Sequence, residues 1–301
     1  MMKLVKLLFC LSLLTSLLSS VFAGQAPTLD KEDFARLGKT LWQAKVGWLP
    51  SAQLIASSEA LVVIGGKSGL MALAPNDGKT LWKRAPRIPI SWGSIHEGTL
   101  YLQYSRYWIV RALDAKSGKE KWRLSLGDKI HGEIAIGQKS IVLSLGPAND
   151  GLVTARRLVA LNKENGQLLW SWQGGITEAF SPLLVDETVI VKCTDGNIYA
   201  KDINSGKTKW IFDTLGTSAH RVVLLKNGNL AWLGKHRRYL VKKSDGSLLS
   251  SFPLPKGYTH GLEGKNDTYY LCGRDGYFYS FNGVTGERNW RRAMRFAPTD
   301  Y

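Results

Sequence analysis

The sequence predicts an all-β protein, a β-propeller of four-stranded blades, and three observations carry this prediction. A Gly-x-x-x-Trp motif recurs about every 40 residues along the 301-residue chain. A short run rich in β-branched and aromatic residues accompanies each repeat, as expected for strands. Apart from the first 23 residues and residues 31–37, no stretch shows helical periodicity. Four-stranded sheets of this repeat length bury their faces by stacking around a ring.

The repeat is anchored by seven glycines, which are 40 residues apart except for one interval of 48. They are Gly38, Gly78, Gly118, Gly166, Gly206, Gly246 and Gly286. Six of them precede a tryptophan by four residues: Trp42, Trp82, Trp122, Trp170, Trp210 and Trp290. We expect each tryptophan to wedge against the next blade, with its N–H reaching a carbonyl there. After Gly246 the tryptophan is replaced by Ser250, and we expect Phe252 to fill the space.

The residues before each glycine predict a strand–turn–strand hairpin. Asp114, Asn162, Asp202 and Asn282 each stand four residues before their glycine. Such side chains bond backbone N–H groups two residues on, and the glycine permits a positive φ. The eight additional residues of the long interval fall around residues 146–153 and indicate a loop insertion.

The strand runs set the number of blades. Six runs have the composition of middle strands, at residues 61–66, 99–104, 140–145, 188–193, 230–234 and 268–273. They predict six blades between about residues 52 and 295. A further strand near residues 40–46 is expected to pair with the last blade and close the ring. A seventh blade would have to be assembled from terminal pieces that the sequence does not provide.

The N-terminal segment reads as a cleaved signal peptide of residues 1–23. Lys3 and Lys6 precede an apolar stretch of about a dozen residues, and Ala23 ends a small-residue cleavage site. The stretch is shorter than the ~20 apolar residues of a transmembrane helix. We therefore expect a lead segment at 24–37, a single propeller domain at 38–301, and export to the periplasm, or secretion as second choice, with no transmembrane segment after cleavage.

The formal net charge of +16 favours acidic partners. The candidate partner-binding basic surface comprises Lys235, Arg237, Arg238, Lys242, Lys243, Arg291, Arg292 and Arg295. The same residues could instead be solvated faces and protected edge strands. The partners expected are envelope proteins or an acidic envelope surface, bound by a monomer within a complex. An exported chain without a nucleic-acid motif is not expected to bind nucleic acid specifically.

Residues 112–122, ALDAKSGKEKW, resemble the pyrroloquinoline-quinone (PQQ)-type propeller repeat, A-x-D-x-x-T-G-x-x-x-W. With its copies, the resemblance covers nearly all of the chain after the signal segment. It implies the propeller fold but no single function, because the superfamily includes quinoprotein dehydrogenases and also BamB-like periplasmic scaffolds of outer-membrane β-barrel assembly. The small exported chain is more similar to the second group, which implies a scaffold without a cofactor.

A quinone (PQQ)-binding oxidoreductase or sensor is the alternative. The resemblance implies that such members hold the quinone with calcium, an Asp base and often a vicinal Cys–Cys disulfide. Here Cys193 and Cys272 are far apart in the chain, on units two blades apart, beyond the ~7 Å limit for a disulfide. The histidines His131, His220 and His260 are expected to be separate loop residues rather than a metal cluster. We therefore predict no catalytic, cofactor-binding or metal-binding residue.

Overall fold

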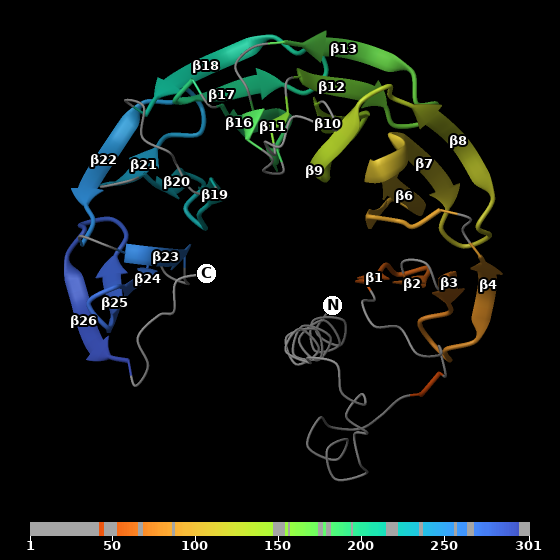
Figure 1. The fold of residues 1–301 in the computed structure, drawn as a ribbon, viewed down its shortest axis with the longest axis horizontal. Helices are drawn as coiled ribbons and strands as arrows, with labels where there is room; N and C mark the ends of the chain where they lie inside the picture. Colours follow the sequence, from red (N-terminus) through yellow and green to blue (C-terminus); the bar gives the residue numbers. More distant parts are fainter. Residues whose placement is uncertain are drawn as a thin grey trace.

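The computed structural model shows six four-stranded antiparallel sheets that follow one another along an arc (Figure 1). The structure describes residues 42–44, 53–65, 69–85, 88–146, 154–155, 157–173, 177–178, 182–193, 195–214, 222–234, 237–255, 258–263 and 268–294. We number the sheets as blades 1 to 6 in chain order. The prediction of six four-stranded blades is confirmed.

The first three blades are built from strands that follow one another in sequence, with one interruption. Blade 1 contains β1 (Gln53–Ala56), β2 (Leu61–Ile64), β3 (Leu70–Leu73) and β4 (Thr80–Arg84). Blade 2 contains β5 (Trp92–His96), β6 (Thr99–Tyr104), β7 (Ile109–Asp114) and β8 (Glu120–Ser125), with a 3₁₀ turn, η1 (Ser105–Tyr107), between β6 and β7. Blade 3 contains β9 (Lys129–Ile136), β10 (Ser140–Gly146), β12 (Arg157–Asn162) and β13 (Leu168–Trp172).

The last three blades repeat the same order of strands. Blade 4 contains β15 (Leu183–Val185), β16 (Thr188–Lys192), β17 (Asn197–Asp202) and β18 (Thr208–Asp213). Blade 5 contains β19 (Val223–Leu224), β20 (Leu230–Leu233), β21 (Arg237–Val241) and β22 (Leu248–Pro253). Blade 6 contains β23 (Tyr258–Glu263), β24 (Thr268–Gly273), β25 (Tyr277–Asn282) and β26 (Arg288–Ala293).

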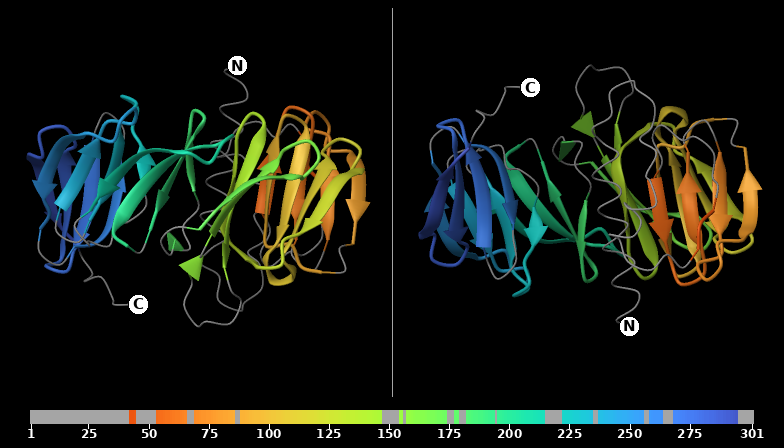
Figure 2. Two further views of the ribbon diagram at one scale, coloured as in Figure 1. Left: turned by 90° about the horizontal axis from the view of Figure 1, so that it is seen from above. Right: turned by 90° about the horizontal axis from the view of Figure 1, so that it is seen from below.

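Each blade presents its first strand to the centre of the arc and its fourth strand to the rim. Figure 1 shows β4, β8, β13, β18, β22 and β26 along the outside. Seen from above and below, the sheets stand side by side and across the plane of the arc (Figure 2). Blades 1 and 6 lie apart at the two ends of the arc (Figure 1).

The apolar core lies between neighbouring sheets. One cluster joins buried residues of blades 1 and 2, such as Val62 and Leu100. Another joins blades 4 and 5, where Ile198 and Trp232 are packed together. Side chains alternate between the two faces of a strand, so each middle strand contributes to two such clusters. The middle strand β10 is buried along its whole length.

Two features of the fold differ from the sequence prediction or were not part of it. Of the predicted closing strand at residues 40–46, the structure describes only residues 42–44, which are not in a strand; the other four residues lie outside the described part of the chain. Trp42 lies on blade 1, at the far end of the arc from blade 6. A two-stranded sheet of β11 (Thr154–Ala155) and β14 (Thr177–Glu178) links the segment before β12 to the segment after β13.

Candidate functional site

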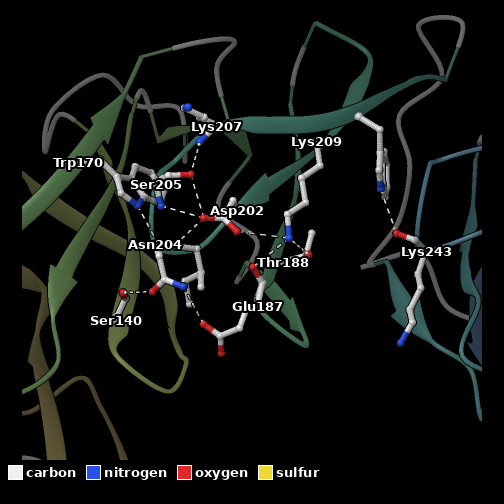
Figure 3. A network of polar contacts seen from close by, with 12 residues as sticks. Ser140, Trp170, Glu187, Thr188, Asp202, Asn204, Ser205, Lys207, Lys209 and Lys243 are labelled. Atoms are coloured by element: carbon white, nitrogen blue, oxygen red, sulfur yellow. Dashed lines mark hydrogen bonds and ion pairs between the residues drawn. The ribbon is translucent and has the colours of Figure 1, made fainter.

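The hairpin between the third and fourth strands is the most regular local structure of each blade. In blade 4, the Asp202 carboxylate accepts hydrogen bonds from the backbone N–H groups of Asn204 at 3.2 Å and Ser205 at 2.9 Å (Figure 3). Gly206 follows with φ of +69°. This conformation costs other residues free energy, which is why the motif requires glycine. The turn therefore holds its carbonyl groups in a fixed direction, towards the preceding blade.

A tryptophan of the preceding blade occupies this turn. Its indole N–H donates to the carbonyl three residues before the glycine, and its ring lies over the glycine so closely that a Cβ would come under 3.0 Å from it. The donor–acceptor pairs are Trp42–Pro75 at 2.8 Å, Trp82–Ala115 at 2.9 Å, Trp122–Lys163 at 3.0 Å, Trp170–Ile203 at 2.8 Å and Trp210–Lys243 at 3.0 Å. The last four pairs fasten blades 1 to 5 to one another in order, each by one ring contact and one hydrogen bond, and the first joins Trp42 to blade 1.

Between blades 5 and 6, two residues make the contacts that the tryptophan makes at the other interfaces. The ring of Phe252 lies against Gly286, where the other blades place an indole. The Arg238 guanidinium donates to the Gly283 carbonyl at 2.7 Å, and this carbonyl is the counterpart of those that accept from indoles. Arg238 and Phe252 face each other in the register of β21 and β22, so their side chains emerge on the same face.

Arg238 is therefore not part of an exposed basic surface, and the sequence prediction is wrong for this residue. Its relative exposure is 0%. The guanidinium also lies 4.7 Å from the ring centre of Tyr269 in blade 6, a cation–π contact. By the register of the strands, Arg238 is at the position of Ile198 in blade 4. A position that is apolar in blade 4 therefore holds a cation that hydrogen-bonds across the interface.

The remaining basic residues of blade 5 lie at opposite ends of β21. Arg237, at its start, is exposed and donates to the Ser251 hydroxyl at 2.7 Å and to the Ser251 carbonyl at 2.9 Å. Lys242 and Lys243 follow its end, about 17 Å away for five residues of strand. Lys243 forms an ion pair with Asp186 of blade 4 at 2.7 Å. The predicted basic surface is therefore divided between two faces of the arc.

Blade 6 presents two arginines beside aromatic rings, of which Trp290 is exposed and Tyr277 half-buried. Arg291 lies 4.6 Å from the ring centre of Tyr277, and Arg292 lies 5.6 Å from that of Trp290. Every residue of β26 is exposed, and Trp290 has a relative exposure of 38%. Trp290 differs in this from Trp122 and Trp210, which are buried against the next blade. Arg291 and Arg292 pair with the first half of β25, at the same end of the blades as Arg237.

Several sequence predictions concern residues outside this description. Lys235, Arg295 and His220 lie outside the described residues, as does the side chain of His260, while His131 is buried in β9. Cys193 is buried and Cys272 half-buried, on second strands of blades 4 and 6. Within the described residues, no group of three His, Cys, Asp or Glu side chains is arranged to hold a metal ion.

Burial shifts the pKa of two side chains at the interface of blades 3 and 4. It raises the pKa of the Cys193 thiol to about 12. It also lowers the pKa of Lys201, whose Nζ donates to the Thr208 hydroxyl at 2.8 Å and lies 4.2 Å from the Trp172 ring centre. Nothing in the sequence marked Lys201 as buried, because only the register shows that it occupies the place of Leu113 in blade 2.

A second buried lysine joins blade 3 to blade 2. Lys163 is 9% exposed, and its Nζ donates to Glu97 at 2.5 Å and to the Gly137 carbonyl at 3.3 Å. Donation to the Glu97 carboxylate holds the pKa of that group below its ordinary value. The Lys163 carbonyl accepts from both Trp122 of β8 and Tyr101 of β6, so one residue joins these two strands to the turn that carries Glu97. These contacts stabilise the interface between blades 2 and 3.

None of the helices in the described part of the chain is long and apolar enough to span a membrane. The geometry described so far is that of a stack of interlocked sheets. Its polar groups are used mainly in turns and interfaces.

Known proteins share both the repeat and the fold. The profile of the family described as "Outer membrane protein assembly factor BamB" matches residues 105–236. The BamB of Yersinia pestis is 27% identical over 256 residues, which cover 76% of this chain and 63% of that protein. The serine/threonine-protein kinase AfsK of Streptomyces griseus is 31% identical over 146 residues, covering 45% of this chain and 17% of the kinase. The chain thus spans less than two thirds of the length of either relative.

A solved structure extends this likeness to the fold. The crystal structure of BamB from Moraxella catarrhalis superposes with a TM-score of 0.58 at 19% identity, covering 80% of this chain and 72% of that one. At this identity the superposition shows the fold alone. Together with the repeated Trp–Gly interfaces, these matches identify the chain as a PQQ-repeat β-propeller with relatives among the BamB proteins.

Proposed function

We propose that the chain is a non-catalytic interaction propeller of the bacterial cell envelope, with a role in outer-membrane protein assembly. The observation that carries this proposal is the match to BamB in both sequence and fold, over 76% of the chain in the Yersinia relative. The architecture agrees with a scaffold. Many polar groups of the described blades form hydrogen bonds in turns and at the interfaces between blades.

The proposed contact surface consists of Arg237, Arg291 and Arg292 with the neighbouring rings of Tyr277 and Trp290. Arginine, tyrosine and tryptophan are the residues that anchor protein interfaces most often. The exposed positions of the three arginines at one end of blades 5 and 6 suit a partner with acidic side chains. Lys242 and Lys243 contribute less, since both lie within 4 Å of a carboxylate of this chain.

The test is capture from a detergent extract of bacterial envelopes at physiological salt. We expect the wild-type protein to retain a discrete outer-membrane assembly protein. The variant Arg291→Glu/Arg292→Glu should lose it, because two cations at the contact surface become like-charged with the partner. The control Lys116→Glu/Lys119→Glu makes the same change in charge on the exposed hairpin of blade 2 and should retain the partner.

Three results would contradict the proposal. One is recovery of polyanions alone, released by moderate salt. Another is equal loss of the partner in both variants. The third is saturable, stoichiometric binding of PQQ with Ca²⁺, followed by absorbance and tryptophan fluorescence, which would favour the quinone-binding alternative.

A further inference from the structure

A cavity of about 500 Å³ lies between blades 1 and 2. Three arginines line it: Arg84 at the end of β4, Arg111 in β7 and Arg123 in β8. None of the described residues in its lining is acidic. Its buried apolar lining includes Leu70, Tyr104 and Leu113. The volume is in the range of pockets that bind small molecules.

At two other interfaces between blades, the positions that correspond to Arg84 and Arg111 hold a pair of aromatic rings. Between blades 3 and 4 these are Trp172 and Tyr199, with ring centres 5.0 Å apart, and between blades 4 and 5 Phe212 and Tyr239, 5.7 Å apart. By the register of the strands, Arg84 stands where Trp172 and Phe212 stand, two residues after the motif tryptophan. Arg111 stands where the tyrosines stand. A pair of arginines has thus replaced an aromatic pair, and a cavity remains between the blades.

The three arginines of this cavity have one carboxylate nearby, so their positive charges are only partly balanced. Arg111 and Arg123 lie directly opposite each other across β7 and β8, an arrangement in which like charges repel. The Arg111 side chain is 25% exposed, and its Nε is buried without a hydrogen bond among the described residues. One carboxylate, Glu120, lies nearby, 3.6 Å from that Nε. Arg84 and Arg123 are exposed and Arg111 is partly buried. Three guanidinium groups around one cavity create a field that attracts an anion.

We propose that this cavity binds a phosphate monoester carried on a small apolar or aromatic group. A phosphate presents three oxygens and nearly two negative charges, which suits three guanidinium groups better than a two-oxygen carboxylate does. The apolar lining would hold the attached group. The site is separate from the contact surface on blades 5 and 6, so it goes beyond the proposed function.

Calorimetric titration of the full chain with phenyl phosphate tests the site. We expect saturable binding of one molecule per chain, with inorganic phosphate weaker because it cannot use the apolar lining. The variant Arg84→Leu/Arg111→Met should bind phenyl phosphate at least about tenfold more weakly, because two charge-assisted contacts are lost. It should fold, because Leu124 and Met71 are the residues at these positions in blades 2 and 1.

The matched control is Arg288→Ser, which removes an exposed arginine of β26 that lies outside both the cavity and the contact surface. It should bind phenyl phosphate with unchanged affinity. If the double variant unfolds, Arg123→Ser replaces it, since blade 5 has Ser251 at that position. No saturable binding by the wild type, equal affinity in the cavity variant, or equal weakening in the control would each overturn the proposal.

Vesicles identify the source of the phosphate. Binding to phosphatidylcholine vesicles that contain phosphatidate, weakened in the cavity variant more than in Arg288→Ser, would support the site and indicate a lipid phosphate. Binding of phenyl phosphate without binding to such vesicles would support the site and indicate a free small phosphate.

Discussion

At the contact between blades 5 and 6, two residues together replace the tryptophan of the repeat. The indole of the repeat fills space and donates a hydrogen bond, whereas here Phe252 fills the space and Arg238 donates the bond. Opposite Ser250 stands Leu240, where blade 4 has Ala200 opposite Trp210. The larger side chain of Leu240, opposite Ser250 on the adjacent strand, therefore fills part of the volume that the tryptophan occupies in other blades.

We predict that Arg238→Ile lowers the free energy of unfolding by about 1–3 kcal/mol, because the buried Gly283 carbonyl loses its donor. The triple variant Arg238→Ile/Leu240→Ala/Ser250→Trp should regain most of this loss, since it rebuilds the pattern of Ile198, Ala200 and Trp210 in blade 4. Urea unfolding measures both changes.

Arg237→Ile is the control, because this neighbouring arginine is exposed. It should stay within about 0.5 kcal/mol of the wild type. Equal stability of Arg238→Ile and the wild type would show that the guanidinium does not replace the indole.

The position of Arg238 could not be predicted from the sequence. A run of lysines and arginines is usually solvated, and the alternation of strand faces does not say which arginine turns inward. Phe252 was within reach of prediction, because the loss of tryptophan at Ser250 left a space to fill. The repeat places Arg84 at the position of Trp172 and Arg111 at that of Tyr199. Spacing alone does not show that these two positions meet between neighbouring blades, which the structure shows.

The hairpin between the third and fourth strands is the element on which each blade interface depends. Its glycine combines a positive φ with close approach to an indole, and these two requirements can be separated by experiment. Gly206 has both, with φ of +69° and a hypothetical Cβ 2.6 Å from the Trp170 ring. Gly228 has φ of +82° and nothing within 4 Å of its Cβ position.

We predict that Gly206→Ala destabilises the protein more than Gly228→Ala does, by at least about 1 kcal/mol in urea unfolding. Both variants bear the ~1–2 kcal/mol cost of a left-handed alanine. Only the first also displaces the Trp170 ring, whose indole bonds to Ile203, and overpacking of this kind adds about 1–3 kcal/mol. Equal losses in the two variants would mean that the indole moves away without cost.

At this scale the sequence was a good guide, because each hairpin is encoded within about a dozen residues. The motif predicts the turn, its glycine and the strands on either side. The pairing of β11 with β14 was beyond prediction, because each of these strands has two residues and the two are separated by β12 and β13. So short a strand leaves no pattern of alternation to detect.

The whole molecule is an arc whose last blade differs from the others in what covers it. In β26 every residue is exposed, and Trp290 contacts Tyr270 and Phe278 of its own blade. Trp122, by contrast, is 8% exposed between two blades. We therefore expect the motif tryptophan to contribute less to the free energy of unfolding at the end of the arc than in its middle.

We predict that Trp290→Ala lowers the free energy of unfolding by about 1–2 kcal/mol, because the ring is partly exposed already. Trp122→Ala should cost about 3–5 kcal/mol, as expected for a large ring removed from a packed interface. Chemical unfolding compares the two. Equal losses would indicate that the outer face of blade 6 is covered in solution.

The arc has a consequence for the order in which the protein forms and opens. Among the described strands of the six sheets, each pairs with its neighbour in sequence, apart from the step over β11. The contacts therefore join neighbouring strands and neighbouring blades, and folding does not wait for the closure of a long loop. Blades coupled to nearest neighbours behave as a one-dimensional array, in which a terminal unit has half the support of an inner one. Amide hydrogen exchange should accordingly begin in blade 6 and reach the middle blades last.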